Sequence, residues 1–253
     1  MSTKGVVDIV FCLDASHSMR PCIDAVREHV VAFVRGLEDG ARAAQRSVDW
    51  RVDFLAHAAD EAGGVYRAHS IRTDNMGTIG ALYPRPDPAQ FFTTDLDEFR
   101  RGLSRVEIGG DEATLWALDL ALDYPWRPRR SCHRVVVCLT DEPFETNAEQ
   151  ATQQAQLPAL RNKIQQLGVM LFLVAPDSTA FGELAMVDKS EYETVDAAGD
   201  GLRQVEFDKV LAYMGKSVSM AGTPGGTDDD AGVRRALYGQ DQLGATDKSV
   251  RGR

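Results

Sequence analysis

The pattern of apolar and polar residues divides most of the chain into alternating strands and helices. Near-continuous apolar runs at 6–13, 135–139 and 169–174 are typical of buried parallel strands. Between them, apolar residues recur every three or four positions, as on a helix that faces a core. This alternation predicts an α/β fold, with a doubly wound, mostly parallel central sheet flanked by helices on both faces.

The same pattern gives bounds for the other elements. We expect helices over 23–40, 95–103, 115–122, 149–167, 181–187 and 207–218, and further strands over 48–58, 65–68 and 191–195. Gly40 is expected to end the first helix, because glycine is common just past a helix end. Residues 60–88 are rich in glycine and proline, which indicates a long surface loop.

The chain is predicted to form one domain followed by a tail. At 253 residues and 43% hydrophobic content it can bury a full single-domain core. The composition shifts after Met220, where a Gly- and Pro-containing stretch leads into a segment poor in large apolar residues. We therefore assign residues 1–220 to the domain and residues 221–253 to a flexible or disordered tail.

Charge and hydropathy exclude two classes of partner. The formal net charge of -10 lacks the basic footprint that nonspecific nucleic-acid binding requires. No apolar run approaches the roughly 20 residues of a membrane helix, and Met1–Gly5 enters the first strand without a signal-peptide pattern. We expect a cytoplasmic protein, in which Cys12 and Cys138 are buried, reduced thiols within apolar strands.

Candidate chemistry begins where the first strand ends. Asp14, Ser16 and Ser18 follow the apolar run at alternating positions, at the kind of strand end where open α/β sheets bind ligands. Three hard oxygens on a tight loop suit Mg²⁺ or Mn²⁺ better than Zn²⁺. The alternative is that these side chains cap the following helix, which is a common use of aspartate and serine.

Two later segments complete a recognisable set. A Gly-Gly-Asp-Glu-Ala-Thr stretch at 109–114 precedes a helical pattern, and the strand at 135–139 ends in Thr-Asp-Glu. With the first loop, these segments resemble a von Willebrand factor A domain. The segment 92–99, the Gly-Gly-Asp-Glu stretch and Trp126-Arg127 resemble the standalone intracellular bacterial members of this family. The resemblance implies a metal-ion-dependent adhesion site formed by Asp14, Ser16, Ser18, Thr114 and Asp141, and the same doubly wound fold.

The threonine has alternatives in the sequence. Thr78, Thr93 and Thr94 also lie between the first and third loops. Thr94 stands just before a short helical pattern, where an N-cap is the plainer interpretation. Glu142 replaces the glycine that often follows the Thr-Asp pair in the family, so the coordination at the third loop stays open.

The resemblance implies a binding function. In this family the ion keeps a position for an acidic residue of a partner, so we expect an adaptor or regulatory subunit rather than an enzyme. Intracellular relatives work beside ATPases, kinases or phosphatases, and by analogy some belong to stress or defence systems. The alternative is a metal-dependent, phosphatase-like hydrolase. Against it, the sequence lacks the nucleophile-elbow, phosphate-loop and dinucleotide motifs, and of its histidines only His17 is expected near the site.

Overall fold

One six-stranded sheet organises the molecule. The computed structural model describes residues 5–59, 66–72, 91–142, 150–187 and 190–195. The strands are β1 Gly5–Asp14, β2 Val48–Ala59, β3 Tyr66–His69, β4 His133–Leu139, β5 Val169–Pro176 and β6 Glu191–Val195. Their order is β3-β2-β1-β4-β5-β6, in which β3 is antiparallel to β2 and every other neighbouring pair is parallel. The predicted doubly wound, mostly parallel sheet is confirmed.

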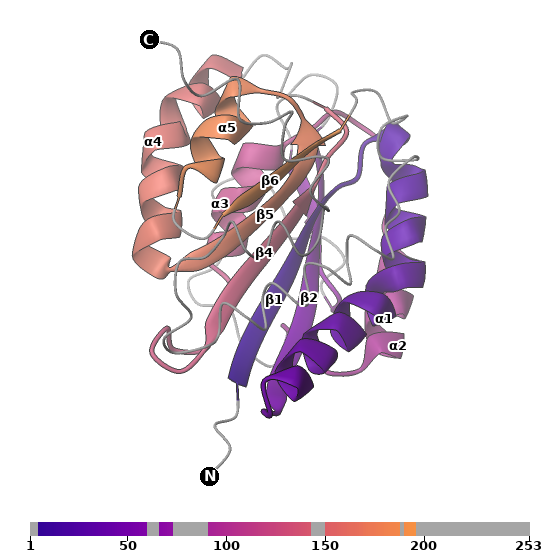
Figure 1. Cartoon of the computed structure of the whole chain (residues 1–253). Helices are drawn as coiled ribbons and strands as arrows, with labels where there is room; N and C mark the ends of the chain where they lie inside the picture. The colour runs from indigo at the N-terminus through magenta and orange to yellow at the C-terminus, as the bar shows by residue number, and fades with distance from the viewer. Residues whose placement is uncertain (1–4, 60–65, 73–90, 143–149, 188–189, 196–253) are drawn as a thin grey trace, which may run out of the picture.

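Helices cover both faces of this sheet. They are α1 Arg20–Ala43, α2 Leu96–Leu103, α3 Thr114–Leu122, α4 Gln150–Leu167 and α5 Thr179–Ala185, with a short 3-10 turn, η1, at His17–Met19. Figure 1 shows α1 and α2 on one face, and α3, α4 and α5 on the other. The chain passes from β1 to β2 on one side of β1 and later places β4 on the other side. The carboxyl ends of β1 and β4 therefore lie at a topological switch point, where α/β sheets bind ligands.

The alternation of side chains along β1 supplies two cores. On the face of α1 and α2, Phe11 makes edge-to-face contacts with Phe33 and Phe99, at centroid distances of 5.4 and 5.7 Å. On the other face, Cys12 and Cys138 are in register on neighbouring strands and join the cluster that includes the leucines of α3. Both are buried free thiols, as the sequence predicts.

Two predicted helix ends are wrong. α1 continues past Gly40 because Ala41 is still buried, and it ends where Gln45 takes a left-handed φ of 54° without glycine. At that end the Arg46 amide donates to the Ala41 carbonyl at 2.9 Å. The cap of α2 is Asp95 rather than Thr94, because the Asp95 carboxylate accepts the amide of Asp97.

The edge of the sheet formed by the strands' amino ends is held by ion pairs around Asp8. This carboxylate, which interrupts the apolar run of β1, is fully buried. Arg51 donates to both of its oxygens at 2.7 Å, and Arg127 donates from its backbone amide and Nε at 2.7 and 2.6 Å. Burial opposes ionisation, but the two guanidinium groups lower the pKa of Asp8 below its usual value.

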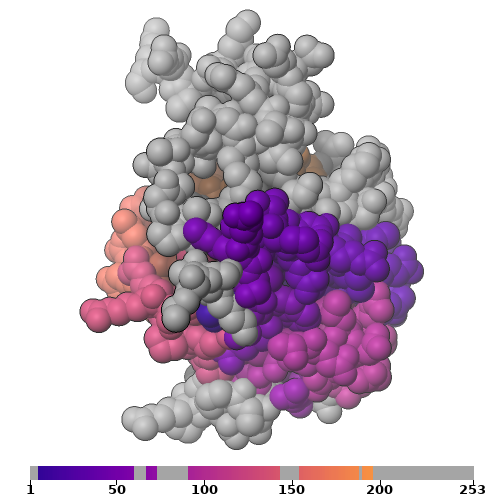
Figure 2. Space-filling view, turned by 60° about the horizontal axis from the view of Figure 1, so that its bottom comes forward, coloured from indigo at the N-terminus to yellow at the C-terminus, as the bar shows by residue number. Residues whose placement is uncertain are grey.

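Figure 2, with this side of the molecule turned forward, also shows α1 and α2 side by side.

Several predictions fall on residues that the structure does not describe. They are most of the loop at 60–88, the helix at 207–218, the boundary after residue 220 and the tail at 221–253. Among the residues that it does describe, no helix is both long and apolar enough to cross a bilayer.

Candidate metal centre

Asp14 joins the first and third loops of the candidate site. It is the last residue of β1 and is fully buried. Its Oδ1 accepts the backbone amide of Ser16 at 2.8 Å, and its Oδ2 accepts the Thr140 hydroxyl at 2.9 Å. Thr140 directly follows β4, so one carboxylate links the ends of both strands at the switch point.

Ser16 and Ser18 do not cap the helix that follows them. Their hydroxyls lie 3.2 Å apart, and neither η1 nor α1 has a side-chain cap at its start. Ser16 is 3% exposed, so its hydroxyl is held inside the loop rather than in solvent. The capping alternative therefore does not explain this Asp-x-Ser-x-Ser stretch.

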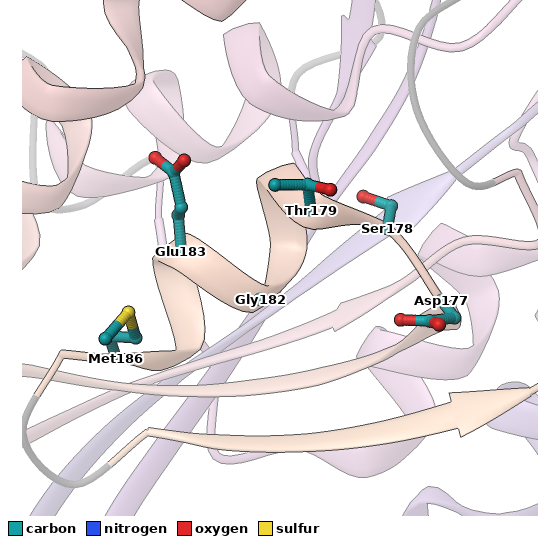
Figure 3. A pocket seen from close by; sticks show the side chains of 6 residues that line it. All are labelled: Asp177, Ser178, Thr179, Gly182, Glu183 and Met186. Atoms are coloured by element: carbon teal, nitrogen blue, oxygen red, sulfur yellow. The ribbon is translucent and has the colours of Figure 1, made fainter. Parts of the chain in front are cut away.

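A similar run after β5 shows what a cap looks like in this chain. Asp177, Ser178 and Thr179 line one end of a shallow hollow along α5 (Figure 3). There the Ser178 hydroxyl accepts the Phe181 amide at 3.2 Å and caps α5. We therefore read this second acid-and-hydroxyl run as the start of a helix.

Backbone contacts fix the second loop beside the first. The Gly109 amide donates to the Ala15 carbonyl at 2.8 Å, and Ala59 and Asp111 exchange two backbone bonds of 2.7 and 2.9 Å. Gly110 has a φ of 93°, and a Cβ there would collide with the carbonyl oxygen of Ala59, so only glycine fits. The loop leads directly into α3, whose first residue is Thr114, 2% exposed.

The other threonines are placed elsewhere. The backbone of Thr93 pairs with Val52, which lies opposite Ile9 and well before the carboxyl end of β2. The Thr93 hydroxyl accepts the Asp95 amide at 2.9 Å, and Thr94 is exposed. Thr78 is outside the described residues. Among the described candidates, Thr114 is the one whose loop is bonded to the loop of Asp14.

Negative charge collects at this edge. Burial and the neighbouring, fully buried Asp141 raise the pKa of Asp14, hydrogen bonds from Ser16 and Thr140 lower it, and the net result is a pKa of about 7. Burial also raises the pKa of Glu112 to about 8, with added repulsion from Asp14 and other acids. The pKa of Glu142 is raised by burial and by Asp141. A bound cation would relieve this repulsion.

The donor set fits a hard divalent ion. Carboxylates of Asp14 and Asp141 with hydroxyls of Ser16, Ser18 and Thr114 supply only oxygen, which suits Mg²⁺ or Mn²⁺. In the described part of the chain, no three or more His, Cys, Asp or Glu side chains are grouped so as to hold an ion. An ion at this place would therefore need hydroxyl ligands beside the two carboxylates.

Sequence reasoning missed two neighbours of Asp14. Thr140 is not among the predicted ligands, although it directly precedes Asp141 in the sequence. His57 is the register partner of Asp14 on β2, so the expectation that only His17 lies near the site is wrong. Burial lowers the pKa of His57 to about 3, so its ring is neutral. His17 is exposed, and a side chain at Gly109 would meet its ring.

A comparison with solved structures agrees with this fold. No family model matches the sequence, and no curated protein matches it either. Among solved structures, a von Willebrand factor type A protein from Catenulispora acidiphila has a TM-score of 0.52 at 16% identity, over 84% of this chain and 43% of that one.

Two further solved structures give lower TM-scores. The pilus adhesin SpaC from Lactobacillus rhamnosus GG has a TM-score of 0.49 at 14% identity, over 87% of this chain and 31% of that one. Proximal thread matrix protein 1 from the mussel byssus has a TM-score of 0.48 at 17% identity, over 87% of this chain and 47% of that one. This chain spans less than half the length of each of the three proteins. At these identities the likeness to the Catenulispora acidiphila protein concerns the fold alone, which is that of a von Willebrand factor A-type domain.

Proposed function

We propose that this von Willebrand factor A-type fold holds Mg²⁺ or Mn²⁺ at the carboxyl ends of β1 and β4 and uses the ion to bind an acidic residue of a protein partner. One observation carries the proposal: the pKa of the Asp14 carboxylate is raised by burial and by a second buried carboxylate, Asp141, beside two serine hydroxyls that lie close to each other instead of capping a helix. Such a group of oxygens is stabilised by a divalent cation.

Each proposed ligand has a defined origin in the fold. Asp14, Ser16 and Ser18 come from the first loop, Thr114 from the start of α3, and Asp141 from the residue after Thr140. When bound, the ion supplies a Lewis-acidic position that attracts a carboxylate oxygen. Thr140 holds the orientation of Asp14 by donating to Oδ2, while Gly110 lets the second loop approach β2 closely.

The role proposed is binding rather than hydrolysis. The sequence contains no nucleophile-elbow, phosphate-loop or dinucleotide motif, which favours binding over catalysis. We propose an adaptor or regulatory subunit that acts in the cytoplasm beside an ATPase, kinase or phosphatase, in a bacterial stress or defence system.

The first test is metal binding by the purified full chain. Calorimetry with Mg²⁺ and Mn²⁺ should give one site per chain for the wild type and none for Asp14→Asn. A capture from native lysate, with wild type and Asp14→Asn in Mg²⁺ or EDTA, then tests the partner. Retention of a protein by the wild type in Mg²⁺ alone supports the proposal, and retention in all conditions contradicts it.

A further inference from the structure

His57 occupies a defined place next to the proposed ligands. It pairs with Asp14 in the β1–β2 register, and side chains of such partners point to the same side of a sheet. Two residues earlier on these strands, Leu55 and Cys12 both belong to the core cluster under α3. His57 and Asp14 therefore form the next row on that face.

The start of α3 covers this row. Two residues before His57, Leu55 belongs to the same core cluster as Leu115, and two residues after it, Ala59 packs against Ala113. The ring of His57 therefore lies on the face of the sheet that carries the start of α3, where Thr114 is the first residue.

The ring has no partner in this place. His57 is 0% exposed, and neither Nδ1 nor Nε2 has a hydrogen-bond partner. A neutral imidazole carries one N–H donor and one acceptor, and buried groups of this kind in native proteins are usually satisfied by protein or by ordered water.

We propose that His57 is a positioning residue that hydrogen-bonds a water ligand of the ion in the proposed site, on the side where Thr114 begins α3. The proposal rests on the proposed metal-binding function. We propose a role through water because, among the described residues, His57 does not form a group with both carboxylates that could hold an ion directly. Orientation of a metal-bound water by a neighbouring side chain is a usual function of residues around a metal site.

The experiment compares Mg²⁺ binding and stability in the full chain. His57→Leu replaces the ring by an apolar group of similar size, and His57→Gln keeps hydrogen-bonding capacity. We expect His57→Leu to bind Mg²⁺ about 10- to 100-fold more weakly and His57→Gln to stay close to wild type. Without metal, His57→Leu should melt at or above the wild-type temperature, because it removes an unpartnered polar ring.

The chemical shifts of the histidine ring nitrogens, measured by NMR, distinguish a contact with the metal site from a purely structural role of His57. Saturating Mg²⁺ should move the ring resonances of His57 and leave those of His29, on the remote part of α1, unchanged. Unmoved His57 resonances, or wild-type Mg²⁺ affinity in His57→Leu, would overturn the inference while leaving the metal site in place. Absence of Mg²⁺ binding by the wild type would overturn both the site and the inference.

Discussion

Replacing Asp14 by asparagine should stabilise the metal-free protein and abolish its response to metal. Burial and Asp141 raise the pKa of Asp14 to about 7. At pH 8 the carboxylate is ionised, and its charge costs free energy in the folded state relative to the unfolded state. Because each pH unit is worth about 1.4 kcal/mol, the change from the ordinary value near 4 corresponds to about 4 kcal/mol. Asparagine removes the charge but keeps an oxygen for the Ser16 amide and a polar group beside the Thr140 hydroxyl.

We expect the free energy of unfolding of Asp14→Asn without metal to exceed that of wild type by about 2–4 kcal/mol at pH 8, or roughly 4–15 °C in melting temperature. The sign follows from linkage. A carboxyl with a raised folded-state pKa contributes stability below its unfolded pKa near 4, and that contribution is lost as the pH rises through about 7. The advantage of the variant should therefore shrink as the pH falls toward 5.

The assay is thermal and urea unfolding with EDTA or Mg²⁺. At a Mg²⁺ concentration about 100 times the dissociation constant, wild type should gain about 2.7 kcal/mol and Asp14→Asn nothing. Asp53→Asn is the matched control, because Asp53 is also buried with a pKa raised to about 7 but accepts the amides of Phe54, Ile71 and Phe92 instead of facing the site. A metal-free Asp14→Asn less stable than wild type, or one that still gains from Mg²⁺, would refute the reasoning.

Three other changes test the remaining links. Gly110→Ala should weaken Mg²⁺ binding in calorimetry, because its Cβ would displace the second loop from Ala59, and unchanged affinity would contradict that geometry. Asp8→Ala should lower the free energy of unfolding by about 1–3 kcal/mol, because the partly buried guanidinium groups of Arg51 and Arg127 lose their shared carboxylate, while a folded variant should keep the wild-type Mg²⁺ affinity. Mg²⁺ affinity should fall about tenfold between pH 8 and pH 6, as protons compete for Asp14 with its pKa of about 7; a flat profile would exclude this competition.

Strong periodic segments made the fold predictable. The runs at 6–13, 135–139 and 169–174 consist mostly of apolar residues, which is typical of strands buried on both faces. Each run forms a strand in the structure. The first helix was predicted too short because glycine is only a weak stop signal. Burial of Ala41 outweighed it, and the helix ended at a left-handed Gln45 that no pattern marks.

The composition of the candidate site was predictable, but its neighbourhood was not. Asp14, Ser16 and Ser18 share one short loop, so their proximity is a local property of the sequence. His57 stands more than forty residues away, and its place beside Asp14 depends on the register of β1 against β2. Register is set by tertiary packing, so the pattern of either strand alone does not reveal this pairing.

Three buried aspartates of this sheet show why environment decides where a cation binds. Burial disfavours the charge of each one. Arg51 and Arg127 compensate Asp8, whose pKa is lowered, and backbone amides donate to Asp53. Asp14 instead has Asp141 as a like-charged neighbour. An added cation would compete with arginines at Asp8 and with backbone amides at Asp53. Of these three aspartates, only Asp14 has a repulsion that a cation would relieve. We therefore expect the ion at Asp14, which is also the aspartate that two serines follow at alternating positions.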